Sequence, residues 1–150
     1  MKRLLLISLL LLATGAAPAR AADDTLWATV NRCDTAAHPN EIGIRAALPQ
    51  HGASTAALRF RVQYRDLSDG RWRWVRAADS GWRKVARARE SGWSFEVAGE
   101  GTQILRGVVS YRWKRHGKVV RRARRVTEGG HHSTAGADPK DFSAATCRIS

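Results

Sequence analysis

The stretch LRFRVQYR at residues 58–65 alternates strictly between apolar and polar side chains. Its apolar positions are Leu58, Phe60, Val62 and Tyr64. Because successive side chains of a β-strand point to opposite faces, this pattern predicts a strand with one buried face and one solvated face. Half-buried strands of this kind are typical of antiparallel sheets.

A period of two recurs along the chain. Residues 104–115 place Leu105, Gly107, Val109, Tyr111 and Trp113 on one face. His116 and Gly117 then predict a two-residue hairpin turn before a strand that begins at 118–120. The other expected strands are 26–33, 42–48, 93–97 and 144–149. Short strands separated by turn signals predict an all-β fold, an antiparallel β-sandwich. Residues 128–142, EGGHHSTAGADPKDF, lack periodicity and predict an irregular loop.

The sequence RWRW at 71–74 poses a question of strand register. If 66–70 is a five-residue loop, Trp72 lies opposite Tyr64 and Trp74 opposite Val62, on the apolar face. If the turn is Asp69-Gly70 alone, every side chain changes face. Arg65 then meets Trp74, and Leu67 meets Trp72.

Free energies favour the first register. Cation–π contacts contribute about 0.5–1 kcal/mol each at exposed sites. The second register turns Arg71 and Arg73 toward the apolar face, and an unpaired buried charge costs several kcal/mol. Burial of an aromatic side chain contributes roughly 1.5–3 kcal/mol. We therefore expect inward tryptophans, unless this strand is a sheet edge whose arginines reach water.

The N-terminus has the pattern of a secretory signal peptide. A basic start is followed by an apolar run at 4–12, and small residues end in Ala19-Arg20-Ala21. The apolar run is shorter than the roughly 20 residues of a membrane span. We expect cleavage after Ala21, with Ala17 as the alternative site. Cleavage after Ala21 leaves one domain at 22–150 in a secreted or extracytoplasmic protein without a transmembrane span.

The composition is strongly basic, with 26 lysines and arginines against 13 acidic residues. Two explanations remain open from composition. A high-GC genome favours arginine together with alanine and glycine. Alternatively, a positive surface steers and binds an anionic partner.

The chain contains two cysteines, Cys33 and Cys147. In an exported protein an even number of cysteines predicts disulfide bonds, and two residues allow one pairing. We expect a structural Cys33–Cys147 disulfide.

Two segments carry a resemblance to a known class of domain. FRVQYRDLSDGRWRWV at 60–75 and VVSYRWKRHGKVV at 108–120 resemble the middle and later strands of fibronectin type III-like and immunoglobulin-like domains of secreted bacterial proteins. The resemblance implies a Greek-key β-sandwich used for binding or display. The cysteines depart from it, because they stand at the two ends of the domain.

Basic residues form two candidate sets for contact with a polyanion. The main set is Arg112, Lys114, Arg115, Lys118, Arg121, Arg122, Arg124 and Arg125. The secondary basic face is Arg59, Arg61, Arg65, Arg71 and Arg73. An alternative for 121–125 is an exposed strand whose charges prevent edge-to-edge pairing.

Catalytic and metal motifs are missing from the sequence. It contains no nucleophile elbow, phosphate-binding loop or zinc-protease motif. His131 and His132, near Asp138 and Asp141, match no zinc spacing, so we expect a solvated loop with no metal. The sequence predicts a non-enzymatic binding module without a cofactor, which contacts an anionic polymer or envelope component and reads no specific nucleic-acid sequence. The alternatives are a structural or protein-interaction module without a polyanion ligand and, less favoured, a small hydrolase.

Overall fold

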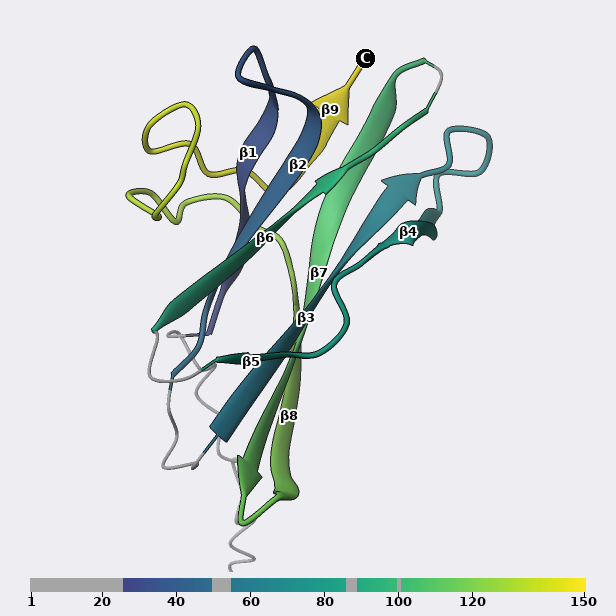
Figure 1. The fold of residues 1–150 in the computed structure, drawn as a ribbon. Helices are drawn as coiled ribbons and strands as arrows, with labels where there is room; N and C mark the ends of the chain where they lie inside the picture. Colours follow the sequence, from purple (N-terminus) through teal and green to yellow (C-terminus); the bar gives the residue numbers. More distant parts are fainter. Residues whose placement is uncertain (1–25, 50–54, 86–88, 100) are drawn as a thin grey trace, which may run out of the picture.

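The computed structural model describes residues 26–49, 55–85, 89–99 and 101–150 (Figure 1). These residues form nine strands and no helix. The expected signal peptide at 1–21 lies outside the described residues. Within the described ranges, no helix is long and apolar enough to cross a membrane.

The strands form two antiparallel sheets that pack against each other, as Figure 1 shows. Sheet A has the order β1 (Ala28–Thr35), β2 (His38–Ala47) and β6 (Glu90–Glu96). Sheet B has the order β4 (Trp72–Asp79), β3 (Thr55–Arg65), β7 (Gln103–Arg115) and β8 (Lys118–Val126). Two short strands complete it: β5 (Arg83–Val85) pairs with β3, and β9 (Cys147–Ile149) pairs with β7.

The two strongest periodic segments form strands as predicted. Residues 58–65 lie in β3 and 104–115 in β7, and these strands pair over their length. The predicted hairpin turn is also confirmed, because Arg115 pairs with Lys118 around His116 and Gly117. Both turn residues have positive φ, 48° and 77°, as the two-residue type I′ turn requires.

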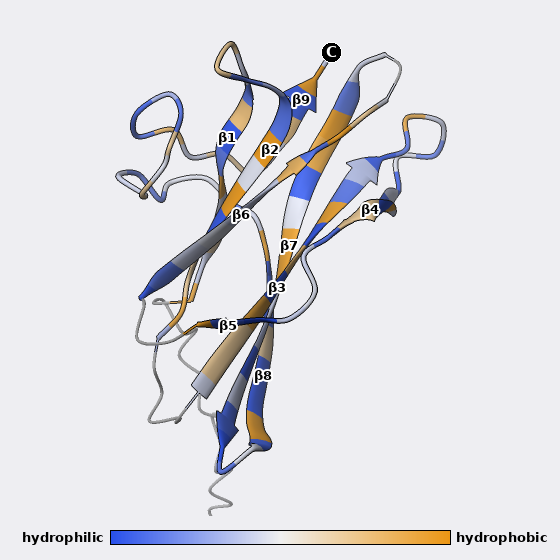
Figure 2. Cartoon of the chain, in the orientation of Figure 1, coloured by the Kyte–Doolittle hydropathy of each residue, from blue (hydrophilic) through white to orange (hydrophobic). Residues whose placement is uncertain are grey.

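The core lies between the sheets, and its pattern follows the alternation in the sequence. Figure 2 shows apolar and polar residues alternating along β7 and β2. Tyr111 and Trp113 of β7 are fully buried. Each polar atom has a backbone acceptor: the Tyr111 hydroxyl donates to the Trp27 carbonyl at 2.8 Å, and Trp113 Nε1 donates to the Pro49 carbonyl at 2.9 Å. Burial raises the pKa of Tyr111.

The predicted disulfide joins the two sheets. Cys33 on β1 of sheet A is bonded to Cys147 on β9 of sheet B, with a Cα–Cα distance of 5.3 Å. The pairing is confirmed, and it is the type of bond that persists in oxidising compartments. Segment 128–142 contains no strand, and it lies along β1, where the Asp138 amide donates to the Asn31 carbonyl at 2.9 Å.

The β3–β4 register differs from both predicted registers. Arg65 pairs with Trp72, Tyr64 with Arg73, and Gln63 with Trp74. Trp72 and Trp74 therefore share a face with the arginines of β3, and the prediction that they join the core is wrong.

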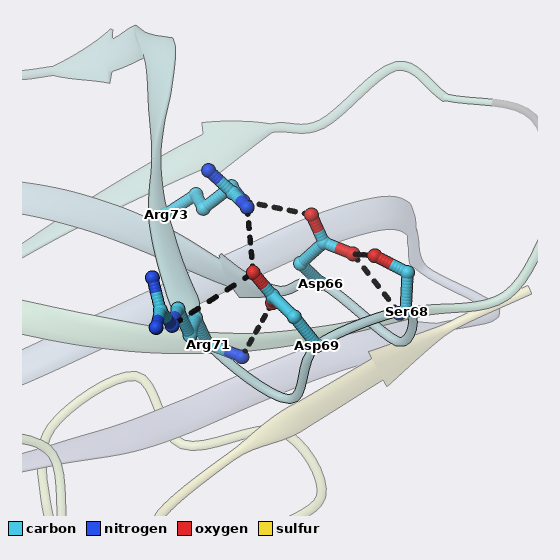
Figure 3. A network of polar contacts seen from close by, with 5 residues as sticks. All are labelled: Asp66, Ser68, Asp69, Arg71 and Arg73. Carbon is cyan, nitrogen blue, oxygen red and sulfur yellow. Dashed lines mark hydrogen bonds and ion pairs between the residues drawn. The ribbon is translucent and has the colours of Figure 1, made fainter.

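The loop at 66–71 explains this register (Figure 3). The Asp66 amide donates to the Arg71 carbonyl at 2.8 Å, which extends the ladder by one residue. Inside the loop, Asp66 accepts from the amide and hydroxyl of Ser68, and Asp69 accepts from the Arg71 amide. These side-chain bonds hold a loop in which residues 67–70 connect the Asp66–Arg71 pair, one residue fewer than in the predicted five-residue loop and two more than in the predicted two-residue turn.

Arg73 avoids the free-energy cost that we expected for burying an unpaired charge on the apolar face. The Arg73 guanidinium lies at the edge of sheet B, where it donates to Asp66 and to Asp69, both at 2.7 Å (Figure 3). Its side chain keeps 49% exposure. The prediction that all five arginines of the secondary basic face lie together is therefore wrong in part. Arg59, Arg61 and Arg65 share a face, whereas Arg73 lies on the other side and Arg71 lies in the loop.

Candidate functional site

The face of sheet B that points away from sheet A, here called the outer face, combines arginine with tryptophan. Opposite residues in a ladder share a face, so the register places the side chains directly. On β3 and β7, Gln63 pairs with Arg106 and Ala57 with Arg112. On β8, Arg122 lies opposite Arg112. The outer-face aromatic residues Trp72 and Trp74 come from β4.

Guanidinium groups stack on these indoles. Arg61 lies 3.9 Å and Arg124 5.5 Å from the ring centroid of Trp74. Arg106 lies 4.1 Å from the centroid of Trp72. Arg112 lies 4.1 Å from that of Trp82, the residue just before β5. We call this set the Trp–Arg ladder: Arg61, Trp72, Trp74, Trp82, Arg106, Arg112 and Arg124.

The ladder is a packed layer. Val108 pairs with Arg61 and so points to the outer face, yet it is 0% exposed. Gln63, also on this face, is 6% exposed, and its side-chain oxygen accepts from Arg106 Nε at 2.9 Å. Ladder side chains must therefore cover the sheet surface, which restricts their own conformations.

The packing places positive charges close together. Burial lowers the pKa of Arg61, and the neighbouring charges of Arg59 and Arg124 lower it further. Burial also lowers the pKa of Arg106, again with a contribution from Arg124. A guanidinium still remains protonated at neutral pH, so the repulsion persists as a positive potential over the face.

One carboxylate faces this potential. The strands of sheet B contain a single acidic residue, Asp79, among many lysines and arginines. Asp79 accepts from Arg59 Nε at 2.8 Å, and this hydrogen bond holds the pKa of Asp79 below its ordinary value. Asp79 forms its ion pair with Arg59. The strands of sheet B therefore provide no further carboxylate for the arginines of the ladder.

The strands of sheet A contain more acidic than basic residues. Its strands contain the acidic residues Asp34, Glu41, Glu90 and Glu96 and the basic residues Arg32 and Arg45. Both arginines are paired: Arg32 Nη1 lies 2.6 Å from Glu41, and Arg45 Nε lies 3.4 Å from Glu90. Positive charge is therefore segregated onto sheet B.

The structure brings together part of the main predicted set. Arg112, Lys114, Arg122 and Arg124 share the outer face. Arg121 and Arg125 point to the other side of β8, where Arg121 lies over Trp113 at 5.2 Å and Arg125 Nε donates to the Leu26 carbonyl at 2.9 Å. Arg115 and Lys118 flank the turn between β7 and β8.

Sequence reasoning missed Arg106 and the three tryptophans of the ladder. Arg106 has the same strand parity as Arg112, which marks it as an outer-face residue. Trp72 and Trp74 depend on the β3–β4 register, which no local pattern specified. Trp82 lies in the short segment before β5, and its contact with Arg112 of the outer face depends on tertiary structure.

A further arginine–tryptophan contact bridges the sheets. Trp93 of β6 pairs with Ile44, so it lies on the inner face of sheet A, at its edge. Arg83 of β5 stacks on it at 3.8 Å from the ring centroid. This contact belongs to the packing between the sheets and is separate from the ladder.

The histidines of segment 128–142 have non-metal partners. His131 stacks on Trp27 with a centroid distance of 4.5 Å, and its Nε2 lies 3.2 Å from Glu128. His132 Nδ1 lies 2.8 Å from the Asp141 carbonyl. Among the described residues, no three His, Cys, Asp or Glu side chains cluster as a metal site.

One hollow lies away from the ladder, and a second adjoins the ladder at Trp74. The first, of about 250 Å³, is lined by Asn31, Arg32, Ile44, Arg45, Gly92, Trp93, Ser94, Ala135 and Gly136. The other, an open groove of about 590 Å³, lies beside β4 and includes Asp66, whose carboxylate is engaged by Arg73. Neither brings two carboxylates or a histidine together among its lining residues.

Comparison with protein-family models, curated proteins and solved structures finds no match for this chain. The described part of the molecule is all-β and consists of two antiparallel sheets.

Proposed function

We propose that this protein is an exported, non-enzymatic binding module that holds an anionic polymer or envelope component on the outer face of sheet B. The observation that carries the proposal is the segregation of charge. Sheet B has one carboxylate in its strands, whereas sheet A has paired arginines and an excess of acidic residues. A general bias toward arginine in the genome would enrich both sheets, so the asymmetry supports selection for an anionic ligand.

The state of the guanidinium groups supports the same conclusion. Arginine presents a planar fork of donors that matches phosphate, sulfate and carboxylate groups. Stacking on indoles restricts Arg61, Arg106 and Arg112 before any ligand arrives. Because less side-chain entropy is then lost on binding, the ladder favours association beyond its net charge alone.

We assign the sandwich to the Greek-key, immunoglobulin-like or fibronectin III-like type. The orders β1-β2-β6 and β4-β3-β7-β8 support this assignment. The second order corresponds to a sheet of C′, C, F and G strands in that fold. Such domains commonly serve in binding, which agrees with the proposal, although fold alone does not specify a ligand.

Chromatography on heparin resin tests the proposal. We expect the purified protein to be retained at low salt and to elute late in a salt gradient. Flow-through at low salt would contradict the proposal and favour a structural or protein-interaction module whose arginines only maintain solubility.

A pair of charge-matched variants separates a specific face from total charge. Arg61→Gln with Arg124→Gln removes two ladder cations. Arg71→Gln with Lys140→Gln removes two exposed cations outside the ladder. We expect the first variant to elute at clearly lower salt than the second. Equal shifts would show that net charge alone causes retention.

A further inference from the structure

We propose that the Trp–Arg ladder binds the sugar–phosphate backbone of single-stranded nucleic acid and does not read the bases. This inference rests on the proposed function and names the class of polyanion that fits the same face. It follows from three properties of the outer face: the stacking of guanidiniums on the indoles, the spacing of the cations, and the extent of the array over three strands.

Each indole of the ladder has a guanidinium stacked on it. Proteins that hold single strands through their bases present open aromatic rings on which the bases stack. Here Trp74 contacts two guanidinium groups, and Trp72 and Trp82 contact one each. Trp74 and Trp82 keep 39% exposure, but a base could stack on a covered face only by displacing an arginine, so we expect the N–H edges of the guanidiniums to provide the main contacts.

Those edges match phosphate. The Nε atoms of Arg61 and Arg112 are buried and have no hydrogen-bond partner. Hydrogen bonding to a ligand therefore falls to the terminal nitrogens, and the two terminal nitrogens of one guanidinium can donate to two oxygens of one phosphate. A tetrahedral oxyanion with two free oxygens, as in a phosphodiester, satisfies this geometry.

The cations are spaced as the phosphates of an extended strand are. Residues two apart on a β-strand are separated by about 6.7 Å, and neighbouring strands by about 4.8 Å. Arg122 and Arg124 on β8 are such a pair, and Arg112 lies opposite Arg122 on the neighbouring strand β7. Successive phosphates of an extended nucleic-acid strand are separated by a comparable length, so one strand of the sheet can contact consecutive phosphates.

The array is broad. Its arginines come from β3, β7 and β8, which are adjacent strands of one sheet. A flexible single strand can lie across such a face and use several rows of cations. A duplex is a rigid cylinder and touches the same face along a narrower line, so we expect it to bind more weakly.

Fluorescence anisotropy with three labelled probes tests the inference. The probes are a thymidine oligonucleotide, an abasic phosphodiester oligomer of the same length, and the duplex form of the oligonucleotide. We expect the first two to bind with similar affinity and the duplex to bind more weakly. Strong binding of the thymidine strand with loss of binding to the abasic oligomer would overturn base-independent recognition. A duplex that binds as tightly as the single strand would overturn the preference for single strands.

Salt dependence measures the number of phosphates contacted. For about four contacts, log K should fall with log salt with a slope of about −3, since each phosphate of a single strand contributes about −0.7. Arg61→Gln with Arg124→Gln should reduce the magnitude of this slope by about 1.4. Arg71→Gln with Lys140→Gln should leave it nearly unchanged. Equal slopes for wild type and the ladder variant would overturn the assignment to the ladder.

Heparin distinguishes failure of this inference from failure of the proposed function. If the protein binds heparin through Arg61 and Arg124 but binds neither single-stranded probe, the proposed polyanion-binding function is supported and the assignment to nucleic acid is overturned. If it binds neither heparin nor the oligomers, both the proposed function and the assignment to nucleic acid are overturned.

Discussion

The guanidinium of Arg61 on β3 lies 3.9 Å from the ring centroid of Trp74 on the neighbouring strand β4. The contact exists because β4 pairs with β3 in a register that turns its tryptophans away from the core. Arg124 reaches the same ring from β8. One indole therefore links cations from two strands of sheet B, and it is the natural place to test the ladder.

Replacing Trp74 should weaken polyanion binding without a change in net charge. Trp74→Leu removes two cation–π contacts, each contributing about 0.5–1 kcal/mol, so the free energy of unfolding should fall by about 1–2 kcal/mol. Affinity for heparin should fall as well, because Arg61 and Arg124 lose the ring that restricts them. Urea unfolding and a heparin binding titration measure the two effects.

A conservative change provides the control. Trp74→Phe keeps an aromatic face for both guanidiniums and should recover part of the affinity that Trp74→Leu loses. If Phe and Leu variants bind heparin equally weakly, the ring does not act by positioning the arginines.

The elements that sequence predicted best depend on local alternation. Phe60 and Val62 alternate with arginines, and Tyr111 and Trp113 alternate with Arg112 and Lys114, so the burial of each strand's apolar face dictates its orientation. The turn at His116 and Gly117 followed from its flanking strands. The disulfide could be predicted because the chain contains two cysteines, which allow one pairing.

The ladder could not be predicted because it depends on relations between strands. The face of Trp72 is set by the 66–71 loop, whose length depends on hydrogen bonds made by the Asp66 and Asp69 side chains. The argument for inward tryptophans also assumed that an inward Arg73 would be buried without a partner. At the sheet edge Arg73 is half-exposed and pairs with Asp66 and Asp69, so the free-energy cost of burying an unpaired charge does not arise.

Removing the disulfide should destabilise the protein strongly. Cys33 and Cys147 are separated by 114 residues, and in the chain-entropy model closure of so long a loop contributes about 4–5 kcal/mol. Cys33→Ala with Cys147→Ala should show this loss in urea unfolding. Addition of a reductant should destabilise the wild type and leave the variant unchanged. A wild type that is insensitive to reductant after the thiols are shown to be free would contradict the expected contribution.

Gly107 of β7 should not tolerate a side chain. A Cβ at this position would lie 2.7 Å from both Ile44 Cδ1 and Thr127 Cγ2, which is closer than real Cβ contacts allow. Ile44 is buried in the core, so Gly107→Ala should cost about 1–3 kcal/mol through overpacking. Gly129→Ala is the control, because its Cβ would make ordinary contacts of 3.5 Å or more. Thermal unfolding of both variants compares them, and similar midpoints would contradict the predicted packing.

The Arg59–Asp79 pair should give the protein an acid-sensitive contribution to stability. The hydrogen bond from Arg59 holds the pKa of Asp79 below its ordinary value of 3.8 in the folded state. A carboxyl group whose pKa is lower when folded binds protons more readily when unfolded, so its contribution is complete above pH 3.8 and is lost as pH falls through the folded-state pKa. NMR titration of the Asp79 carboxyl carbon should show the lowered pKa directly. In Asp79→Asn, the free energy of unfolding should depend less on pH below 3.8 than in the wild type. Arg59→Gln should return the pKa of Asp79 toward its ordinary value, and an unchanged pKa in that variant would show that Arg59 is not the cause.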